Sequence, residues 1–258
     1  MLYKYVSNES MSFSSVLNDD QVYFSSPLQL NDPFELNKNV RMPSKQELKL
    51  WLKEQGVKRK DLKWCLEKNI EVLSRELTNV DSINKALLES SGIFCMTPSC
   101  DNLLMWAHYA NSHKGVCFGF DIEEDHDECF GYSYNVEYRN SHPSISILDF
   151  LNLEIMIRNF DFEKASDFEG LIEKLLFVKS THWEYEKEVR MVRDPLRGSG
   201  LHTFTRSKLK EIIIGSRADE QTVKAVKEYK EKNNPTVKVI EAKPDKVGYM
   251  LNFRELNG

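Results

Sequence analysis

Short strand-like apolar runs recur along the sequence, and they limit the possible folds more than any other feature. Each run is continuously apolar or alternates between apolar and polar residues, which is typical of β-strands. The predicted strands cover residues 2–6, 21–25, 92–97, 115–121, 135–139, 186–193, 202–205, 211–215, 237–242 and 248–254. Predicted helices, such as 7–17, 101–110 and 219–232, do not separate these strands in a regular βαβ alternation. The sequence therefore predicts an α+β fold with mixed, mainly antiparallel central sheets.

Two longer segments have helical character. Residues 44–90 are rich in Leu, Lys and Glu, with apolar residues three or four positions apart, and residues 146–179 are also predicted to be helical. We expect Trp51 and Trp64 to form the apolar seam of the first segment. Both segments are interpreted as helical insertions into a single domain that spans residues 1–258.

Composition and charge exclude several classes of protein. Apolar residues make up 41% and charged residues 29% of the 258-residue chain, so collagen-like, disordered and membrane-spanning classes are not expected. The net charge of −5, without a basic tail, argues against broad nucleic-acid binding through phosphate contacts. The first ten residues contain no apolar signal segment, and no two cysteines have the C-x-x-C spacing. We therefore expect a cytoplasmic protein with reduced thiols, at Cys65, Cys95, Cys100, Cys117 and Cys129.

No zinc site is predicted from the cysteines and histidines. Cys95 and Cys100 are five positions apart, and so are His108 and His113. Five helical positions turn through about 140°, so two ligands at this spacing diverge.

Three segments carry residues suited to chemistry, and the first is a proline-rich loop. It joins Tyr23-Phe24-Ser25-Ser26-Pro27 to Asn31-Asp32-Pro33-Phe34-Glu35. Its prolines restrict the backbone, so the loop is able to present carboxylate and amide groups rigidly. The simpler interpretation, which we favour on sequence alone, is a self-capped turn that closes the core through Phe34.

The second segment runs from Leu104 to Phe120 and crowds aromatic and histidine residues before two glycines. We expect Met105 and Trp106 to lie in the core, whereas His108, Tyr109 and His113 are candidates for facing a pocket. His113 is predicted to lie at a helix C-terminus, where the helix dipole favours the protonated imidazole. A structural role for this histidine as a cap is the alternative.

The third segment is Thr181-His182-Trp183-Glu184-Tyr185-Glu186-Lys187-Glu188-Val189-Arg190. In a strand, Glu186, Glu188 and Arg190 share one face, opposite Val189 and Met191. An exposed face of mixed charge is one interpretation. Aromatic residues immediately before the carboxylates favour a pocket for a flat ring.

Together the three segments resemble a large bacterial family known as domain of unknown function two-nine-seven-one. The matching motifs are the Tyr-Lys-Tyr strand at 3–5, the FSSP and NDPFE motifs at 24–35, Cys95-Met96-Thr97, the MWAHY motif with the following His and Gly, and the WEYEKEVR motif at 183–190. The resemblance covers nearly the whole chain apart from the helical insertions.

The order of predicted strands and helices is also similar to the ADP-ribosyltransferase fold, in the branch of toxins that modify nucleic acid. This resemblance implies that NAD is the substrate and that Glu188 or Glu186 stabilises the oxocarbenium-like charge that develops as nicotinamide leaves. It further implies catalytic or NAD-binding roles for His113, Tyr3, Lys4, Tyr23, Ser25, Asn31, Asp32, Glu35, His108, Tyr109, Trp183 and Arg190.

Several of these residues have a specific implied role. Arg190 and Lys4 would contact the pyrophosphate, Tyr23 or Tyr109 would stack on nicotinamide, and Ser25 would brace the catalytic glutamate. His113 would act as general base toward the acceptor. The sequence departs from this fold family at the first strand, which has Tyr3-Lys4-Tyr5 where such transferases have His or Arg.

The resemblance suggests an NAD-consuming bacterial toxin or phage-defence effector, with nucleic acid or protein as acceptor and no membrane association. Two alternatives stay open. A metal-dependent hydrolase or nuclease would place Asp32, Glu35 and Glu188 around a divalent cation. A non-catalytic nucleotide-sensing or partner-binding module would use the insertion at 44–90 as a docking surface or as the interface of a homo-oligomer.

Overall fold

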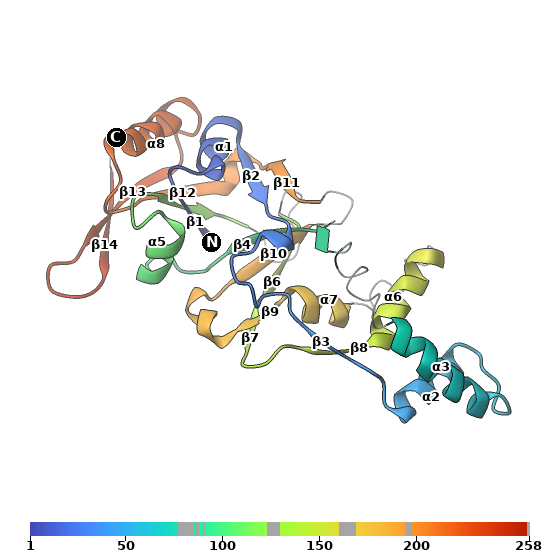
Figure 1. The fold of residues 1–258 in the computed structure, drawn as a ribbon. Helices are drawn as coiled ribbons and strands as arrows, with labels where there is room; N and C mark the ends of the chain where they lie inside the picture. The colour runs from blue at the N-terminus through green and yellow to red at the C-terminus, as the bar shows by residue number, and fades with distance from the viewer. Residues whose placement is uncertain are drawn as a thin grey trace. The chain divides into compact units, whose positions relative to one another are not determined.

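The computed structural model describes residues 1–76, 85, 88–89, 91–122, 130–159, 169–193 and 198–256 (Figure 1). The chain divides into two compact units. The first unit comprises Met1–Gln29, Ser90–Val136 and His182–Gly258, and the second comprises Leu30–Glu89 and Glu137–Thr181. Helices and strands are combined in mixed, mostly antiparallel sheets, so the predicted α+β class is confirmed.

The first unit is built on a five-stranded sheet. Its strands are β1 (Leu2–Val6), β5 (Val116–Phe120), β12 (Leu209–Ile214), β13 (Lys238–Pro244) and β14 (Leu251–Glu255), in that order. All neighbours are antiparallel except β12 and β13, which helix α8 (Glu220–Lys232) connects as a parallel crossover. Helices α1 (Met11–Asp19) and α5 (Leu103–Tyr109) complete the helices described in this unit.

A second sheet of the first unit carries the segment with the glutamates. It consists of β4 (Gly92–Met96), β10 (Val189–Arg193) and β6 (Tyr132–Asn135), in that order and antiparallel. The short strands β2 (Gln21–Phe24) and β11 (Gly200–Thr203) form a separate pair. Three short 3₁₀ helices, η1 (Pro27–Gln29), η3 (Thr181–Glu186) and η4 (Arg206–Lys208), lie among these elements.

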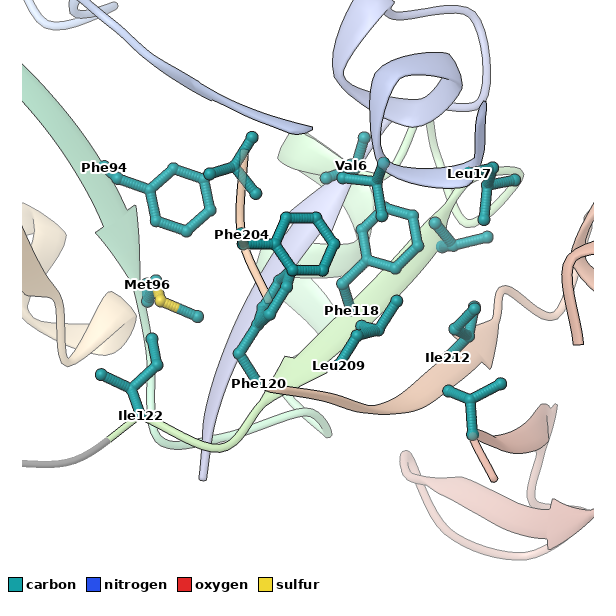
Figure 2. Close-up of a cluster of buried hydrophobic side chains, with 14 of the residues drawn as sticks. Val6, Leu17, Phe94, Met96, Phe118, Phe120, Ile122, Phe204, Leu209 and Ile212 are labelled. Carbon is teal, nitrogen blue, oxygen red and sulfur yellow. The ribbon is translucent and has the colours of Figure 1, made fainter. Parts of the chain in front are cut away.

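A phenylalanine-rich core packs one face of the five-stranded sheet against the second sheet and against α1 and α8 (Figure 2). Phe118 and Phe120 of β5 meet Phe94 and Met96 of β4 and Phe204 in this core. On the other face of the five-stranded sheet, residues such as Tyr5 of β1 and Cys117 of β5 face α5 and form a smaller cluster around Trp106. Because strand residues alternate between faces, the two apolar faces of this sheet account for the continuously apolar runs at β5 and β12.

The second unit contains the helical insertions. The helices given bounds within its described residues are α2 (Lys45–Glu54), α3 (Leu62–Glu76), α6 (Ile147–Asn159) and α7 (Glu169–Leu176). Two parallel strand pairs accompany them, β3 (Asn39–Arg41) with β8 (Ser144–Ser146) and β7 (Glu137–Arg139) with β9 (Val178–Ser180). The parts of the predicted insertions at 77–84, 86–87, 90 and 160–168 lie outside the described residues.

Three sequence predictions are wrong in local detail. Trp64 is exposed on α3, whereas Trp51 is half-buried and its indole Nε1 donates a hydrogen bond to Asn152 at 2.6 Å, so only Trp51 serves the predicted seam. Phe34 is also exposed and does not close a core. The strand predicted over 186–193 begins only at Val189, because the preceding residues form η3 and Lys187 has a left-handed backbone with φ of 46°.

Within the described residues, no helix combines the length and the apolar character needed to cross a membrane.

Candidate functional site

The residues best placed for chemistry in the first unit form what we call the aromatic–carboxylate cluster, defined as His108, Tyr109, Trp183, Tyr185 and Glu186. Helix α5 supplies the first two residues and η3 supplies the other three.

A side-chain amide joins the two elements of the cluster. Asn102 caps α5, where its Oδ1 accepts hydrogen bonds from the backbone N–H groups of Leu104 and Met105. Its Nδ2 donates to the backbone carbonyl of Tyr185 at 2.7 Å. One side chain therefore fixes both the start of α5 and the position of η3.

The cluster contains a buried carboxylate. Glu186 is 3% exposed, and its Oε1 accepts a hydrogen bond of 2.6 Å from the Tyr109 hydroxyl. A hydrogen bond to an ionised acceptor is short and is stronger than one between neutral groups. The contact therefore fixes the orientation of the Glu186 side chain.

The aromatic rings of the cluster lie at contact distances from one another. The centroid of the His108 ring lies 6.4 Å from that of Tyr109 and 6.5 Å from that of Tyr185. The Trp183 and Tyr185 centroids are 6.1 Å apart. His108 is exposed, while the other three rings are half-buried, so the cluster reaches the protein surface. Partly accessible aromatic rings together with a carboxylate suit a planar, partly cationic ligand.

The second glutamate of the segment is held in a buried ion pair. Arg190 donates from Nε to Glu188 Oε1 at 2.7 Å and from Nη2 to Oε2 at 3.1 Å. Burial lowers the pKa of Arg190 to about 9, which still leaves the guanidinium charged at neutral pH. Both carboxylate oxygens of Glu188 are engaged, so this pair has the geometry of a structural brace at the start of β10.

The sequence predicted that Glu186 and Glu188 share one strand face, but the structure shows that they do not. The left-handed residue Lys187 separates Glu186 in η3 from Glu188, which precedes β10. Val189 and Met191 lie in the phenylalanine-rich core as expected, and Arg190 alternates with them.

The Tyr109 contact leads to a stability prediction. Replacing Tyr109 by phenylalanine removes the donor to a buried carboxylate and is expected to lower the free energy of unfolding by about 1–3 kcal/mol. Urea denaturation monitored by circular dichroism measures this change. The matched control is Tyr249→Phe, because the Tyr249 side chain is fully exposed and its replacement is expected to have no effect. Equal stabilities of the two variants would contradict the assigned contact.

The candidates on β1 and β2 have other partners. The Tyr3 hydroxyl donates to Glu211 at 3.0 Å, and burial together with this carboxylate raises the pKa of Tyr3. The Lys4 ammonium lies 4.9 Å from the centroid of the Phe94 ring. Tyr23 donates to Gln29 at 3.1 Å within the loop that follows β2.

The structure does not bring Ser25 to Glu188. Ser25 bridges to Ile93, which is opposite Val192 on β10. Val189, the neighbour of Glu188, is opposite Met96, three residues further along β4. Three residues of a strand span roughly 10 Å. Ser25 therefore does not brace Glu188, one of the two glutamates that the prediction allowed, and Arg190 braces this carboxylate instead.

His113 differs from the prediction in its electrostatics. Helix α5 ends at Tyr109, and residues Asn111 to His113 have left-handed backbone φ angles of 48°, 53° and 69°. The imidazole ring stacks on Trp106 at an interplanar angle of 12°. Burial, with a smaller contribution from Arg217, lowers the pKa of His113, so the net effect of its surroundings disfavours the protonated form that was expected. Among the described residues, its buried Nδ1 has no hydrogen-bond partner.

The NDPFE loop belongs to the second unit, where its polar residues have local roles. Asp32 is buried and accepts a hydrogen bond from the backbone N–H of Phe34 at 2.9 Å, which confirms the expected self-capping. The buried Glu35 carboxylate lies 3.8 Å from the Lys179 ammonium. Asn31 precedes them in the same loop. In the part of the chain that the structure describes, no group of three His, Cys, Asp or Glu residues is arranged to hold a metal ion.

Two site residues were missed from the sequence. Asn102 was overlooked because Asp101 beside it is an equally good capping residue, and nothing local reveals that its amide reaches Tyr185. Lys179 ends a predicted helix, and only the pairing of β9 with β7 places it in a short strand. A lysine among apolar residues is the signal that was available, because a buried lysine requires an acidic partner.

Comparisons with known proteins agree with part of this interpretation. A family described as "Protein of unknown function (DUF2971)" matches residues 105–191, a range that contains the MWAHY and WEYEKEVR motifs and every residue of the aromatic–carboxylate cluster. No curated protein and no solved structure matched the chain, so the resemblance to the ADP-ribosyltransferase fold stays a prediction. The predicted resemblance to this family is confirmed over residues 105–191, where the chain matches the family of proteins of unknown function DUF2971.

Proposed function

We propose that the chain is an NAD-consuming, ADP-ribosyltransferase-like enzyme that holds the nicotinamide end of NAD at the aromatic–carboxylate cluster. The observation that carries the proposal is the Glu186 carboxylate, which is oriented by Tyr109 within a set of aromatic rings that reaches the surface. The nicotinamide ring of NAD is planar and cationic, so it matches both the rings and the carboxylate.

The chemistry assigned to Glu186 is electrostatic. Breaking the bond between the ribose carbon and the nicotinamide nitrogen sends the bonding electrons to nicotinamide and leaves positive charge on the ribose. A fixed carboxylate stabilises this charge more strongly in the transition state than in bound NAD, and this difference accelerates the reaction. The acceptor then forms the new bond to the ribose carbon and loses a proton.

Glu186 is assigned this role in preference to Glu188. Arg190 neutralises Glu188 and occupies both of its oxygens, which leaves that carboxylate poorly suited to stabilising a developing positive charge. Glu186 accepts a hydrogen bond from the Tyr109 phenol, which orients its carboxylate in the aromatic–carboxylate cluster.

Ligand binding at the cluster provides the test. Replacing Tyr185 by alanine removes one ring and is expected to weaken NAD binding by about ten-fold or more, since stacking of a base on an aromatic ring contributes about 1–3 kcal/mol. Isothermal titration calorimetry with NAD measures the affinity. Tyr249→Ala is the matched control, because this exposed tyrosine lies in the turn between β13 and β14. Equal affinities of the wild type and Tyr185→Ala would contradict the assigned site.

A second candidate function is nucleotide binding without turnover, as in a sensing module. The burial of Glu186 and the ion pairing of Glu188 favour it, because neither carboxylate is widely open to solvent. NAD that binds and is recovered intact would identify this function. Expression in bacterial cells separates the two functions in the proposed setting of a toxin or phage-defence effector, since only turnover depletes cellular NAD.

A further inference from the structure

Among the described residues, strand β14 leaves one edge of the five-stranded sheet open. It is the last strand in the order β1-β5-β12-β13-β14, and within the described residues it pairs only with β13. The turn before it is rigidly built. The Asp245 carboxylate accepts from the backbone N–H groups of Val247 and Gly248, each at 2.7 Å, and from Asn252 Nδ2 at 2.8 Å. The strand is therefore ordered before it meets any partner.

The register of the hairpin shows which backbone groups point outward. The N–H of Leu256 donates to the carbonyl of Val239, and the N–H of Asp245 donates to the carbonyl of Met250. The even-numbered residues of β14 therefore form the hydrogen-bonded pairs with β13. In an antiparallel ladder the intervening residues direct their N–H and C=O groups to the other side. Leu251, Phe253 and Glu255 therefore present their backbone groups at the open edge.

The side chains of the same three residues share one face of the sheet. Phe253 is opposite Ala242, which together with Leu251 belongs to the cluster around Trp106. This apolar layer continues outward to Phe253, whose side chain is 38% exposed. The preceding turn adds the exposed side chains of Val247, Tyr249 and Met250. An open strand edge with neighbouring exposed apolar side chains is a typical site of strand pairing between chains.

We propose that two copies of the chain pair antiparallel through β14, about a two-fold axis at Phe253. This arrangement joins the two five-stranded sheets into one continuous sheet across the dimer. It places each Phe253 opposite Phe253 of the second copy, and Leu251 opposite Glu255 of the second copy. The interface lies in the first unit and does not involve the helical insertion at 44–90.

The strand is self-complementary in this register. The outward backbone groups permit a two-fold axis at any residue from Leu251 to Glu255, because each such axis sets odd-numbered residues opposite odd-numbered residues. An axis at Arg254 or Glu255 would set two like charges against each other, and an axis at Leu251 or Asn252 would place turn residues before Leu251 in the ladder. An axis at Phe253 uses all of β14, pairs the two aromatic rings and sets Arg254 opposite Asn252 of the second copy. A second copy is therefore the partner that fits this edge.

Disulfide trapping tests the proposal at a single position. Directly opposed residues of a hydrogen-bonded antiparallel pair have Cα atoms about 5.5 Å apart, which is within the range that a disulfide spans. Phe253→Cys is therefore expected to form a cross-linked dimer on mild oxidation. The matched control is Glu255→Cys on the same face, because the two copies of this residue would lie roughly 13 Å apart or more. The wild-type chain controls for its own cysteines.

Charge variants at the axis test the same arrangement without oxidation. Light scattering after gel filtration is expected to give twice the 30.1 kDa chain mass for the wild type. Phe253→Lys and Phe253→Glu are each expected to run as monomers, because like charges meet at the axis, and their mixture is expected to restore a dimer. Circular dichroism confirms that each variant is folded. A monomeric wild type, equal cross-linking at positions 253 and 255, or a mixture that stays monomeric would each overturn the proposal.

Discussion

Replacing Arg190 by methionine is expected to lower the free energy of unfolding by about 3–5 kcal/mol, the cost of leaving one member of a buried ion pair without its partner. Arg190 is 0% exposed, and the variant leaves the Glu188 carboxylate, 4% exposed, without the two hydrogen bonds that it now accepts. Urea denaturation followed by circular dichroism measures the change. The loss is among the largest that a single substitution is expected to cause in this protein.

The chain contains a matched control for this experiment. Arg139 also bonds a glutamate two residues earlier, Glu137, through Nε and Nη2 at 2.6 Å each, but both side chains are largely exposed. Arg139→Met is therefore expected to cost less than about 1 kcal/mol. The double variant Glu188→Leu/Arg190→Met is expected to be more stable than Arg190→Met alone, because it removes the orphaned charge. Similar losses for Arg139→Met and Arg190→Met would contradict the brace assigned to the buried pair.

The largest effect on activity is expected at Glu186. Replacing Glu186 by glutamine keeps its size but removes the negative charge, and it is expected to lower the rate of nicotinamide release from NAD by about 100- to 1000-fold. Chromatography of the reaction products measures this rate. The Tyr109 hydroxyl is able to donate to the glutamine oxygen, so the variant is expected to remain folded.

Two neighbouring glutamates serve as controls for the Glu186 variant. Glu184 is exposed in the same 3₁₀ helix, and Glu184→Gln is expected to keep full turnover. Glu188→Gln is expected to lose stability and to keep its turnover per folded molecule, because the assigned role of Glu188 is structural. Normal turnover in Glu186→Gln, or its loss in a fully folded Glu188→Gln, would reverse the assignment of the two residues.

The strands of the five-stranded sheet were predictable because burial leaves a strong pattern in the sequence. The predicted strands at 2–6, 115–121 and 211–215 correspond closely to β1, β5 and β12, whose residues alternate between two apolar layers. Strands β3, β8 and β9 were not predicted, because each has three residues and too few side chains to show an alternation.

The motifs of the site were visible in the sequence, but their geometry was not. The alternation of Trp183, Tyr185 and Lys187 with three glutamates imitates a strand, whereas residues up to Glu186 form a 3₁₀ helix. A lysine gives no local sign that it will adopt the left-handed conformation seen at Lys187. The contact between Tyr109 and Glu186 joins residues 77 positions apart, and only the tertiary fold determines it.

The measurement that tests the central claim most directly is incubation of the purified wild-type chain with NAD, followed by separation of the products, in parallel with Glu186→Gln. The proposed function predicts that the wild type releases nicotinamide and that Glu186→Gln, folded to the same extent, does not. Recovery of intact NAD from the wild type, in the presence of candidate nucleic-acid and protein acceptors, would contradict it. The calorimetric titration would then show whether the aromatic–carboxylate cluster binds NAD without turning it over.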